Sequence, residues 1–180
     1  MTHYHPFELQ KAVGAFSEGL YPVAEAMCRR FVESDAHQAQ PLFLLGMALT
    51  RQGAHEEAFQ CLQRSAQIAP RSAETLNALG AVTNELGRDP KEAEQFFIGA
   101  LKINPRCTDA HYNMGVTLQR MRQYEAAATW YERALVIRPD DCEALSNLAI
   151  VFKCLNRHRE GLGLIDRALT LSPQHPLAHW

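Results

Sequence analysis

The pattern of apolar positions over residues 109–139 predicts two helices that are joined by a tight turn. Apolar side chains recur at helical spacing over residues 112–121 and again over residues 127–137. Polar Arg122 and Gln123 separate the two periods, so the turn is expected there. This segment contains no group of side chains of the kind that carries out catalysis. The pattern therefore predicts a structural unit, a helix hairpin.

The same hairpin pattern recurs along the chain with a fixed period. Prolines that end an apolar stretch lie at Pro70, Pro105, Pro139 and Pro173, so that successive prolines are 35, 34 and 34 residues apart. A period in the range of about 20–50 residues is typical of repeat proteins, in which each unit stacks on its neighbours. Small residues, which let helices approach closely, recur in register with the prolines: Gly46, Gly80, Gly115 and Ala149 in the first helix of each unit, and Ala58, Ala93, Ala127 and Gly161 in the second.

This period divides the chain into five units that form a single predicted domain over residues 1–180. Lys11 stands where later units have a large apolar residue, and such a polar substitution is typical of a terminal repeat whose outer face meets water. The third unit has one extra residue in the turn that contains Asp89 and Pro90, which we expect to be the N-cap and the first residue of the second helix. The predicted units are residues 5–38 (a degenerate copy), 39–72, 73–107, 108–141 and 142–175, and residues 176–180 begin a further repeat.

These features resemble the tetratricopeptide repeat (TPR), a helix hairpin of about 34 residues. The resemblance covers nearly the whole chain and implies an all-α fold. In that fold, an α-solenoid, antiparallel helix pairs stack into a right-handed superhelix, and the first helix of each pair lines a concave groove. Unit 108–141 carries the family pattern at Met114, Gly115, Ala127, Tyr131, Ala134 and Pro139, with His111 where tryptophan is most usual.

The resemblance also implies which side chains line the groove, because fixed positions of each first helix face the concave side. The resulting groove has an apolar floor and a polar flank that is mostly uncharged to basic. Such a surface suits an extended peptide or a partner helix that offers both apolar side chains and polar groups. The predicted groove residues are Phe43, Met47, Arg51, Asn77, Ala81, Asn84, Glu85, Tyr112, Asn113, Val116, Gln119, Arg120, Ser146, Asn147, Ile150 and Lys153.

Asn113 and Asn147 occupy the same position in successive units. By similarity to relatives that bind extended peptides, asparagines in this position would hold the peptide backbone. The alternative interpretation is that each asparagine forms a hydrogen bond to the neighbouring repeat. The sequence leaves both interpretations open.

Composition and charge exclude several classes of partner. The 180-residue chain has a formal net charge of -2, which removes the simplest argument for nucleic acid as a partner, since nucleic-acid-binding proteins usually carry a basic stripe that neutralises phosphates. Nucleic acid is therefore not an expected partner. No apolar run approaches the roughly 20 residues that cross a bilayer, and the N-terminal residues do not have the pattern of a signal peptide. The chain is therefore expected to be cytoplasmic and not to bind a membrane. Its five cysteines form no Cys-x-x-Cys pair, which favours reduced thiols.

Neither a metal site nor a catalytic site is predicted. The eight histidines are spread over different repeats, and no His-x-x-x-His spacing occurs among the predicted helices, while His3 and His5 lie in the terminal segment. No Gly-x-Ser-x-Gly elbow and no phosphate-binding glycine loop occur. The sequence predicts no cofactor and no enzymatic activity.

The last residues restart the repeat pattern, because Ala178, His179 and Trp180 align with the beginning of unit 108–141. A following helix would cover an apolar stripe on the second helix of the last complete unit, residues 142–175. Two hypotheses follow: the chain is the N-terminal part of a longer polypeptide, or its open end drives self-association. The stripe consists of Leu162, Ile165, Leu169 and Leu171.

The leading functional hypothesis is a non-catalytic protein-interaction scaffold that binds a protein or peptide ligand in the groove. The first alternative is the substrate- or partner-recruiting N-terminal region of a larger enzyme, such as a glycosyltransferase that resembles the O-linked N-acetylglucosamine transferases. The second alternative is a secretion-type chaperone, since bacterial class II type III chaperones have a similar length and contain such repeats.

Overall fold

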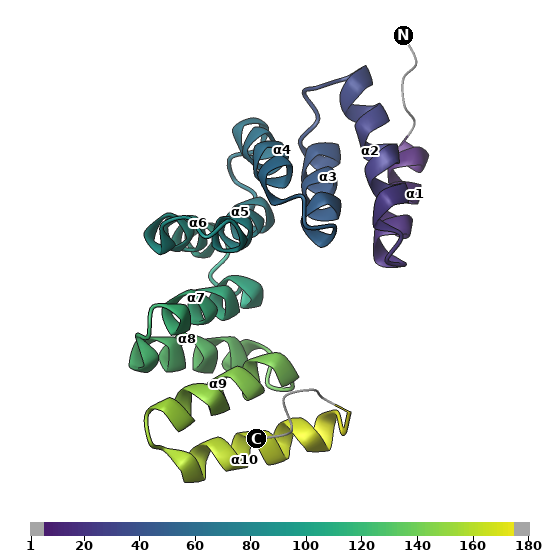
Figure 1. The fold of residues 1–180 in the computed structure, drawn as a ribbon. Coiled ribbons are helices and arrows are strands. Elements are labelled where there is room, and N and C mark those ends of the chain that lie inside the picture. Colours follow the sequence, from purple (N-terminus) through teal and green to yellow (C-terminus); the bar gives the residue numbers. More distant parts are fainter. Residues whose placement is uncertain (1–5, 175–180) are drawn as a thin grey trace. The chain divides into compact units, whose positions relative to one another are not determined.

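The computed structural model describes residues 6–174, which form ten α-helices and no β-strand (Figure 1). The predicted start of a further repeat at residues 176–180, and His3 and His5, lie outside the described residues. The helices are α1 (Pro6–Ser17), α2 (Tyr21–Ser34), α3 (Ala39–Arg51), α4 (His55–Ile68), α5 (Ala73–Glu85), α6 (Pro90–Ile103), α7 (Thr108–Arg120), α8 (Tyr124–Ile137), α9 (Cys142–Cys154) and α10 (His158–Leu171).

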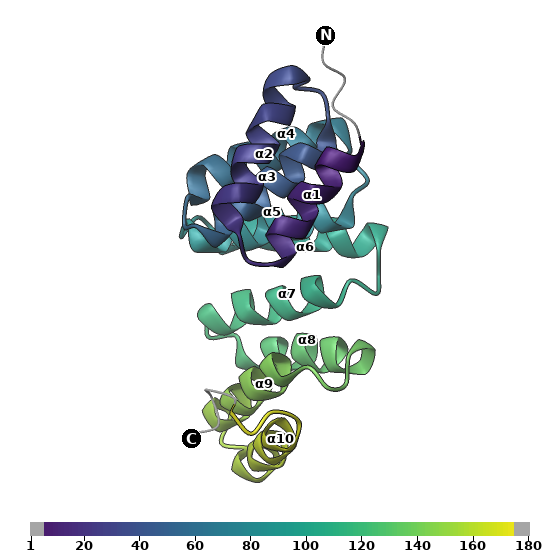
Figure 2. The same cartoon turned by 90° about the vertical axis from the view of Figure 1, so that its right-hand side faces the viewer.

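The chain forms two compact units, Met1–Phe96 and Phe97–Trp180, and the boundary lies within α6. In the first unit, each helix from α1 to α5 packs on the next. In the second unit α7, α8, α9 and α10 pack in the same sequential way, as Figures 1 and 2 show. The predicted fold class, an all-α solenoid of helix pairs, is therefore confirmed, whereas a right-handed superhelix over the whole chain stays a prediction.

Every turn between the two helices of a pair contains one residue in the left-handed region. These residues are Gly19, Gly53, Gly87, Arg122 and Asn156, with φ values of 78, 81, 63, 58 and 60°. In each turn the next amide donates to a carbonyl five residues back, with N···O distances of 2.8–3.3 Å. This is the Schellman motif, in which a left-handed residue lets the chain satisfy the last carbonyls of a helix. The turn predicted at Arg122 and Gln123 has this geometry.

We expect Gly53→Ala to lower the free energy of unfolding by about 1–2 kcal/mol, because a Cβ is unfavourable in the left-handed region. No atom lies within 4 Å of the position that this Cβ would take, so the effect comes from backbone conformation alone. Urea unfolding measures it. The control is Gly14→Ala in α1, which meets no atom within 4 Å either and has no positive φ. That variant should be more stable by about 0.5–1 kcal/mol. Equal effects of the two variants would contradict the conformational explanation.

Small residues allow the two helices of a pair to approach closely, as the sequence predicts. A Cβ on Gly46 would lie 2.6 Å from Cγ of Leu62, and a Cβ on Gly115 would lie 2.7 Å from Cε1 of Tyr131. Leu62 and Tyr131 are both completely buried. Gly46 and Gly115 therefore make room for large, fully buried side chains of the second helices.

The extra residue of unit 73–107 is accommodated in the turn before α6. Helix α6 begins at Pro90, and Oδ1 of Asp89 accepts a hydrogen bond from the Lys91 amide at 3.0 Å. Glu92 lies 3.9 Å from the Arg88 guanidinium. The insertion thus lengthens a loop and leaves the helix start capped.

Candidate functional site

The first helices of neighbouring pairs contact one another inside each unit. Helix α3 contacts both α1 and α5 in the first unit, and α7 contacts α9 in the second. Side chains on the first helices can therefore form a shared surface in each unit, and we call it the first-helix surface. Its predicted members are the sixteen groove residues named above.

Fifteen of these sixteen predicted residues retain some solvent exposure. Arg51, Glu85, Arg120 and Lys153 are exposed. The partly buried members are Phe43, Met47, Asn77, Ala81, Asn84, Tyr112, Asn113, Val116, Gln119, Asn147 and Ile150.

Ser146 differs from the other predicted members because it is only 1% exposed. The corresponding positions of the other repeats hold Phe43, Asn77 and Tyr112, whose side chains are longer and partly exposed. A serine hydroxyl at this position is too short to extend beyond its neighbours. Ser146 is therefore not part of the accessible surface.

In the first unit, the apolar members of the surface are anchored in the core. Phe43 and Met47 pack against the buried cluster that includes Leu45, Leu49 and Leu79. Phe43 also lines a cavity of about 250 Å³, mainly apolar, between α3, the end of α4 and the start of α5. A ligand on this surface would meet apolar groups whose positions are fixed by packing.

In the second unit, hydrogen bonds fix three of the predicted residues. The Asn147 amide donates to the Tyr112 hydroxyl at 2.9 Å, which joins α9 to α7. The Tyr131 hydroxyl donates to Oε1 of Gln119 at 2.8 Å, and the rings of Tyr112 and Tyr131 lie 5.7 Å apart. Sequence reasoning did not identify Tyr131 as the residue that orients Gln119, because its position is otherwise a packing position.

The hydrogen bond from Asn147 is of the kind that the second interpretation of the asparagine pair describes, since it joins neighbouring repeats. Asn113 also has an interaction partner in the structure. A role of either asparagine in holding a peptide backbone stays a prediction.

Burial controls the ionisation of the two tyrosines. It raises the pKa of Tyr112 to about 12, with a further contribution from the nearby Glu143 carboxylate. Burial raises the pKa of Tyr131 still further. Both phenols are therefore neutral hydrogen-bonding groups at physiological pH.

Stability is expected to fall as the pH rises above about 10, where free tyrosine ionises. The Tyr112 pKa of about 12 in the folded chain means that the unfolded chain releases this proton first. The contribution of Tyr112 to the free energy of unfolding is complete below pH 10. It is lost between pH 10 and 12, at up to about 1.4 kcal/mol per pH unit. Urea midpoints across this range measure the fall. Tyr112→Phe should have a shallower pH dependence, and an unchanged slope would contradict this explanation.

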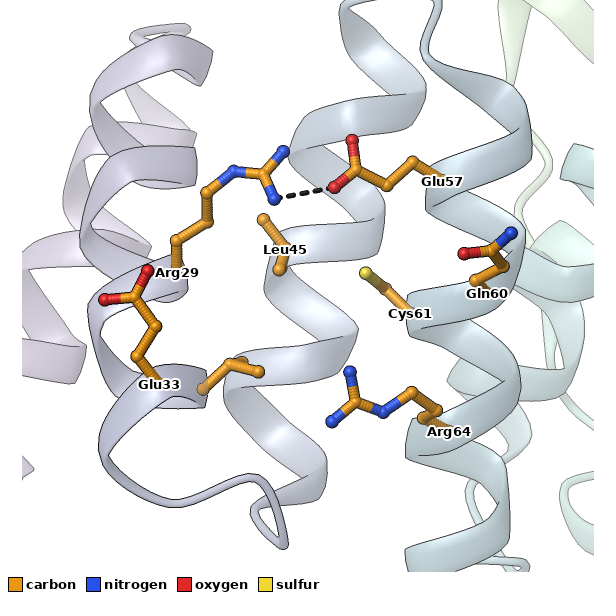
Figure 3. A pocket seen from close by; sticks show the side chains of 8 residues that line it. Arg29, Glu33, Leu45, Glu57, Gln60, Cys61 and Arg64 are labelled. Carbon is orange, nitrogen blue, oxygen red and sulfur yellow. Dashed lines mark hydrogen bonds and ion pairs between the residues drawn. The ribbon is translucent and has the colours of Figure 1, made fainter.

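A smaller pocket of about 200 Å³ lies between α2, α3 and α4 (Figure 3). The Arg29 guanidinium donates to Glu57 across the pocket at 2.6 Å, and this hydrogen bond lowers the pKa of the Glu57 carboxyl. Leu45 and the Cys61 side chain lie between the two helices that carry this ion pair. The pair joins residues 28 positions apart, and no signal in the sequence identifies it.

The pocket does not have the chemistry of a nucleophilic site. Burial raises the pKa of the Cys61 thiol, so the thiol is protonated at neutral pH. Cys28, on the facing helix α2, is also buried and its pKa is raised to about 12. An activated cysteine needs a lowered pKa. These two thiols are therefore parts of the core.

The described residues contain neither a metal-binding cluster nor a membrane-spanning helix. Over residues 6–174, no group of three His, Cys, Asp or Glu side chains converges to hold an ion. In the same range no helix has the length and apolar character to cross a bilayer.

The apolar stripe on α10 is less exposed than the sequence suggests. Ile165 is only 5% exposed and Leu169 is partly buried, because these side chains turn towards the core of the unit. Leu162 and Leu171 are 53% and 42% exposed. The exposed part of the stripe, which a further element could cover, therefore consists mainly of Leu162 and Leu171.

Comparisons with known proteins support this architecture. Two tetratricopeptide-repeat models match the chain, one over residues 9–73 and one over residues 108–141. Among solved structures, MamA superposes with a TM-score of 0.75 at 19% identity, covering 91% of this chain and 95% of MamA. YrrB, described as a TPR protein with an unusual peptide-binding site, superposes with a TM-score of 0.70 at 20% identity, covering 95% of this chain and 88% of YrrB.

Curated relatives match over part of their length. Anaphase-promoting complex subunit 3 of Schizosaccharomyces pombe is 19% identical over 94% of this chain and 26% of its own length. Human protein O-mannosyl-transferase TMTC1 is 29% identical over 84% of this chain and 17% of its own length. The probable N-acetylglucosaminyltransferase SPINDLY of Hordeum vulgare is 30% identical over 60% of this chain and 12% of its own length. The chain thus spans about a quarter or less of these three relatives. The repeat period, the helix hairpins and the matched models together show that the chain belongs to the tetratricopeptide-repeat family.

Proposed function

We propose that this chain is a scaffold that binds an extended peptide or a partner helix on its first-helix surface. The observation that carries the proposal is the contact between α7 and α9, the first helices of two neighbouring repeats. Partly exposed Val116 and Ile150 lie at equivalent positions of these two contacting helices, and exposed Arg120 and Lys153 lie in the last turns of the same helices. Apolar side chains beside polar groups suit the side chains and backbone of a bound peptide. The structural similarity to YrrB, itself described as peptide-binding, supports the proposal.

The test begins with a peptide selected from a random display library against the full chain. Val116→Glu should weaken its binding by about tenfold or more, because a buried charge then replaces an apolar contact. Joint replacement of Tyr112 and Asn113 by alanine should also weaken binding. Thr129→Glu, on the exposed face of α8, is the matched control and should leave the affinity unchanged. Undiminished binding to folded Val116→Glu would overturn the proposal.

As part of this proposal, the chain has no catalytic activity of its own and works in the cytoplasm, with a protein or peptide as its partner. The matched segments, residues 9–73 and 108–141, are repeat units, and this supports a binding role. The formal net charge of -2 supports a protein partner over nucleic acid.

A second candidate function is recruitment of a substrate or partner to a larger enzyme. The matches to TMTC1 and SPINDLY favour it, because this chain aligns with 17% and 12% of those transferases. The coding sequence on both sides of this segment tests it. An adjoining catalytic domain would support the candidate, and stop signals at both ends would overturn it.

We also propose self-association through the apolar side chains of α10. Leu162→Asp should shift the protein towards monomer in light scattering, since Leu162 is 53% exposed and its replacement leaves the core intact. Thr170→Asp, on the same helix, is the control. A monomer at all concentrations for the unmodified chain would contradict the proposal.

A further inference from the structure

A cavity of about 420 Å³ lies in the second unit, where the loop before α7 meets the last turns of α8. Its volume is in the range of about 300–1,000 Å³ that is typical of ligand pockets. Its lining comes from that loop, the first turn of α7 and α8, all within residues 97–180. The lining residues are Pro105, Arg106, His111, Arg133, Val136 and Ile137.

Two arginines of this pocket have no ion-pair partner among the described residues. The Arg133 guanidinium lies over the Trp130 ring at 4.5 Å, and no carboxylate lies within ion-pair distance of it or of Arg106 over residues 6–174. The neighbouring carboxylate of Asp109 is already paired with Arg138 at 3.3 Å. The pocket therefore carries uncompensated positive charge.

The next repeat shows one way in which such an arginine is neutralised. Arg167 lies one repeat, 34 residues, after Arg133, and Asp140 lies 34 residues after Arg106. There the Arg167 guanidinium pairs with Asp140 at 3.3 Å and donates to the Pro139 carbonyl at 2.7 Å. In the pocket, an arginine stands where that aspartate would be, so a carboxylate from another molecule can take its place.

Contacts between rings hold the walls of the pocket in place. The His111 ring lies 5.5 Å from the Trp130 ring, and Trp130 in turn lies under Arg133. Nε2 of buried His111 donates to the Pro105 carbonyl at 2.9 Å, which fixes the loop that carries Arg106. Two guanidinium groups on fixed supports are well suited to bind a carboxylate, since their planar forks match its two oxygens.

Apolar side chains lie beside these two arginines. Val136 is 82% exposed, the largest exposed fraction among the large apolar residues of the described chain, and Ile137 borders the same cavity. In the other repeats this position holds Glu33, Gln67, Lys102 and Thr170, so the valine is specific to this pocket. We propose that the pocket binds a peptide segment in which a bulky apolar side chain stands next to a carboxylate. This site is separate from the first-helix surface and does not depend on the function proposed for that surface.

The test uses the full chain and an acetylated, amidated peptide, Gly-Ser-Leu-Glu-Leu-Glu-Ser-Gly. Fluorescence anisotropy of the labelled peptide gives its affinity, and the NMR signal of the Trp130 indole N–H reports on the pocket. Replacing both glutamates of the peptide by glutamine, or both leucines by serine, should weaken binding by about tenfold. Binding should also weaken at high salt, because the charges of Arg106 and Arg133 are exposed.

The decisive variant is Arg106→Asp, which copies the natural pair of Arg167 with Asp140. It should reduce peptide affinity by at least about tenfold while the chain stays folded, as circular dichroism would show. Val136→Ser should also weaken binding. Arg71→Asp is the matched control, since Arg71 is exposed and holds the position of Arg106 one repeat earlier. It should leave the affinity unchanged.

Three results would overturn the proposal. The first is unchanged affinity of Arg106→Asp for the acidic peptide. The second is loss of binding only in Val116→Glu, which would place the peptide on the first-helix surface. The third is displacement of the peptide by an equal concentration of inorganic phosphate, which would reduce the pocket to a general anion site.

Discussion

Replacing Tyr131 by alanine is expected to lower the free energy of unfolding by about 3–5 kcal/mol, the range for deleting a buried aromatic ring. Tyr131 is completely buried against Gly115, packs beside Tyr112, and donates a hydrogen bond to Gln119. Its removal leaves a cavity between α7 and α8 and also frees the side chain of Gln119. Urea unfolding followed by tryptophan fluorescence measures the loss in this unit, because Trp130 lies in α8, directly before Tyr131.

Tyr131→Phe is the control for the contribution of the ring. It keeps the packing and loses only the hydroxyl, so it should cost about 1 kcal/mol, the usual net contribution of one hydrogen bond. If Tyr131→Ala cost no more than Tyr131→Phe, the ring would not be a packing element of the core.

Gly115→Ala is expected to lower the free energy of unfolding by about 1–3 kcal/mol through overpacking. The new methyl group would lie 2.7 Å from Cε1 and 2.8 Å from Cδ1 of Tyr131. The ring cannot move away freely, because it is buried and its hydroxyl is bonded to Gln119. The control is Gly163→Ala in α10, where no atom lies within 4 Å of the new group. That variant should gain about 0.5–1 kcal/mol from helix propensity.

The two replacements should not be additive. In Tyr131→Ala the ring that Gly115→Ala would strike is absent, so the added methyl group should cost little or even stabilise the helix. A double-mutant cycle measures this coupling, which for residues in contact is about 0.5–3 kcal/mol. Additive effects would show that α7 and α8 do not meet at these two residues.

The fold follows from the sequence because each of its determinants is local or periodic. The prolines and small residues recur at a fixed period, and each marks the same point of a helix hairpin. The left-handed turn residues follow the same register: Gly19, Gly53 and Gly87 predict the conformation of Arg122 and Asn156 once the repeats are aligned. This signal is present in the sequence, although the side chains of arginine and asparagine alone do not reveal it.

The site is less predictable because its properties depend on contacts between repeats. The register places Ser146 and Tyr112 in equivalent positions, yet one is buried and the other is partly exposed, since exposure depends on side-chain length. Ile165 fits an exposed stripe in the sequence and is buried in the structure. The Arg29–Glu57 pair depends on the spacing between neighbouring second helices, which the sequence pattern does not specify.

The chain carries a natural attachment point for a spectroscopic label. Of its five cysteines, Cys28 and Cys61 are buried, Cys107 and Cys142 are partly buried, and Cys154 is exposed. Cys154 ends α9, directly after Lys153. A maleimide dye or nitroxide added at limiting stoichiometry should therefore react first at the end of a first helix, without any engineered cysteine. Quenching or line broadening of that label would then report whether a ligand lies along α9, in the same protein that is used for the affinity measurements.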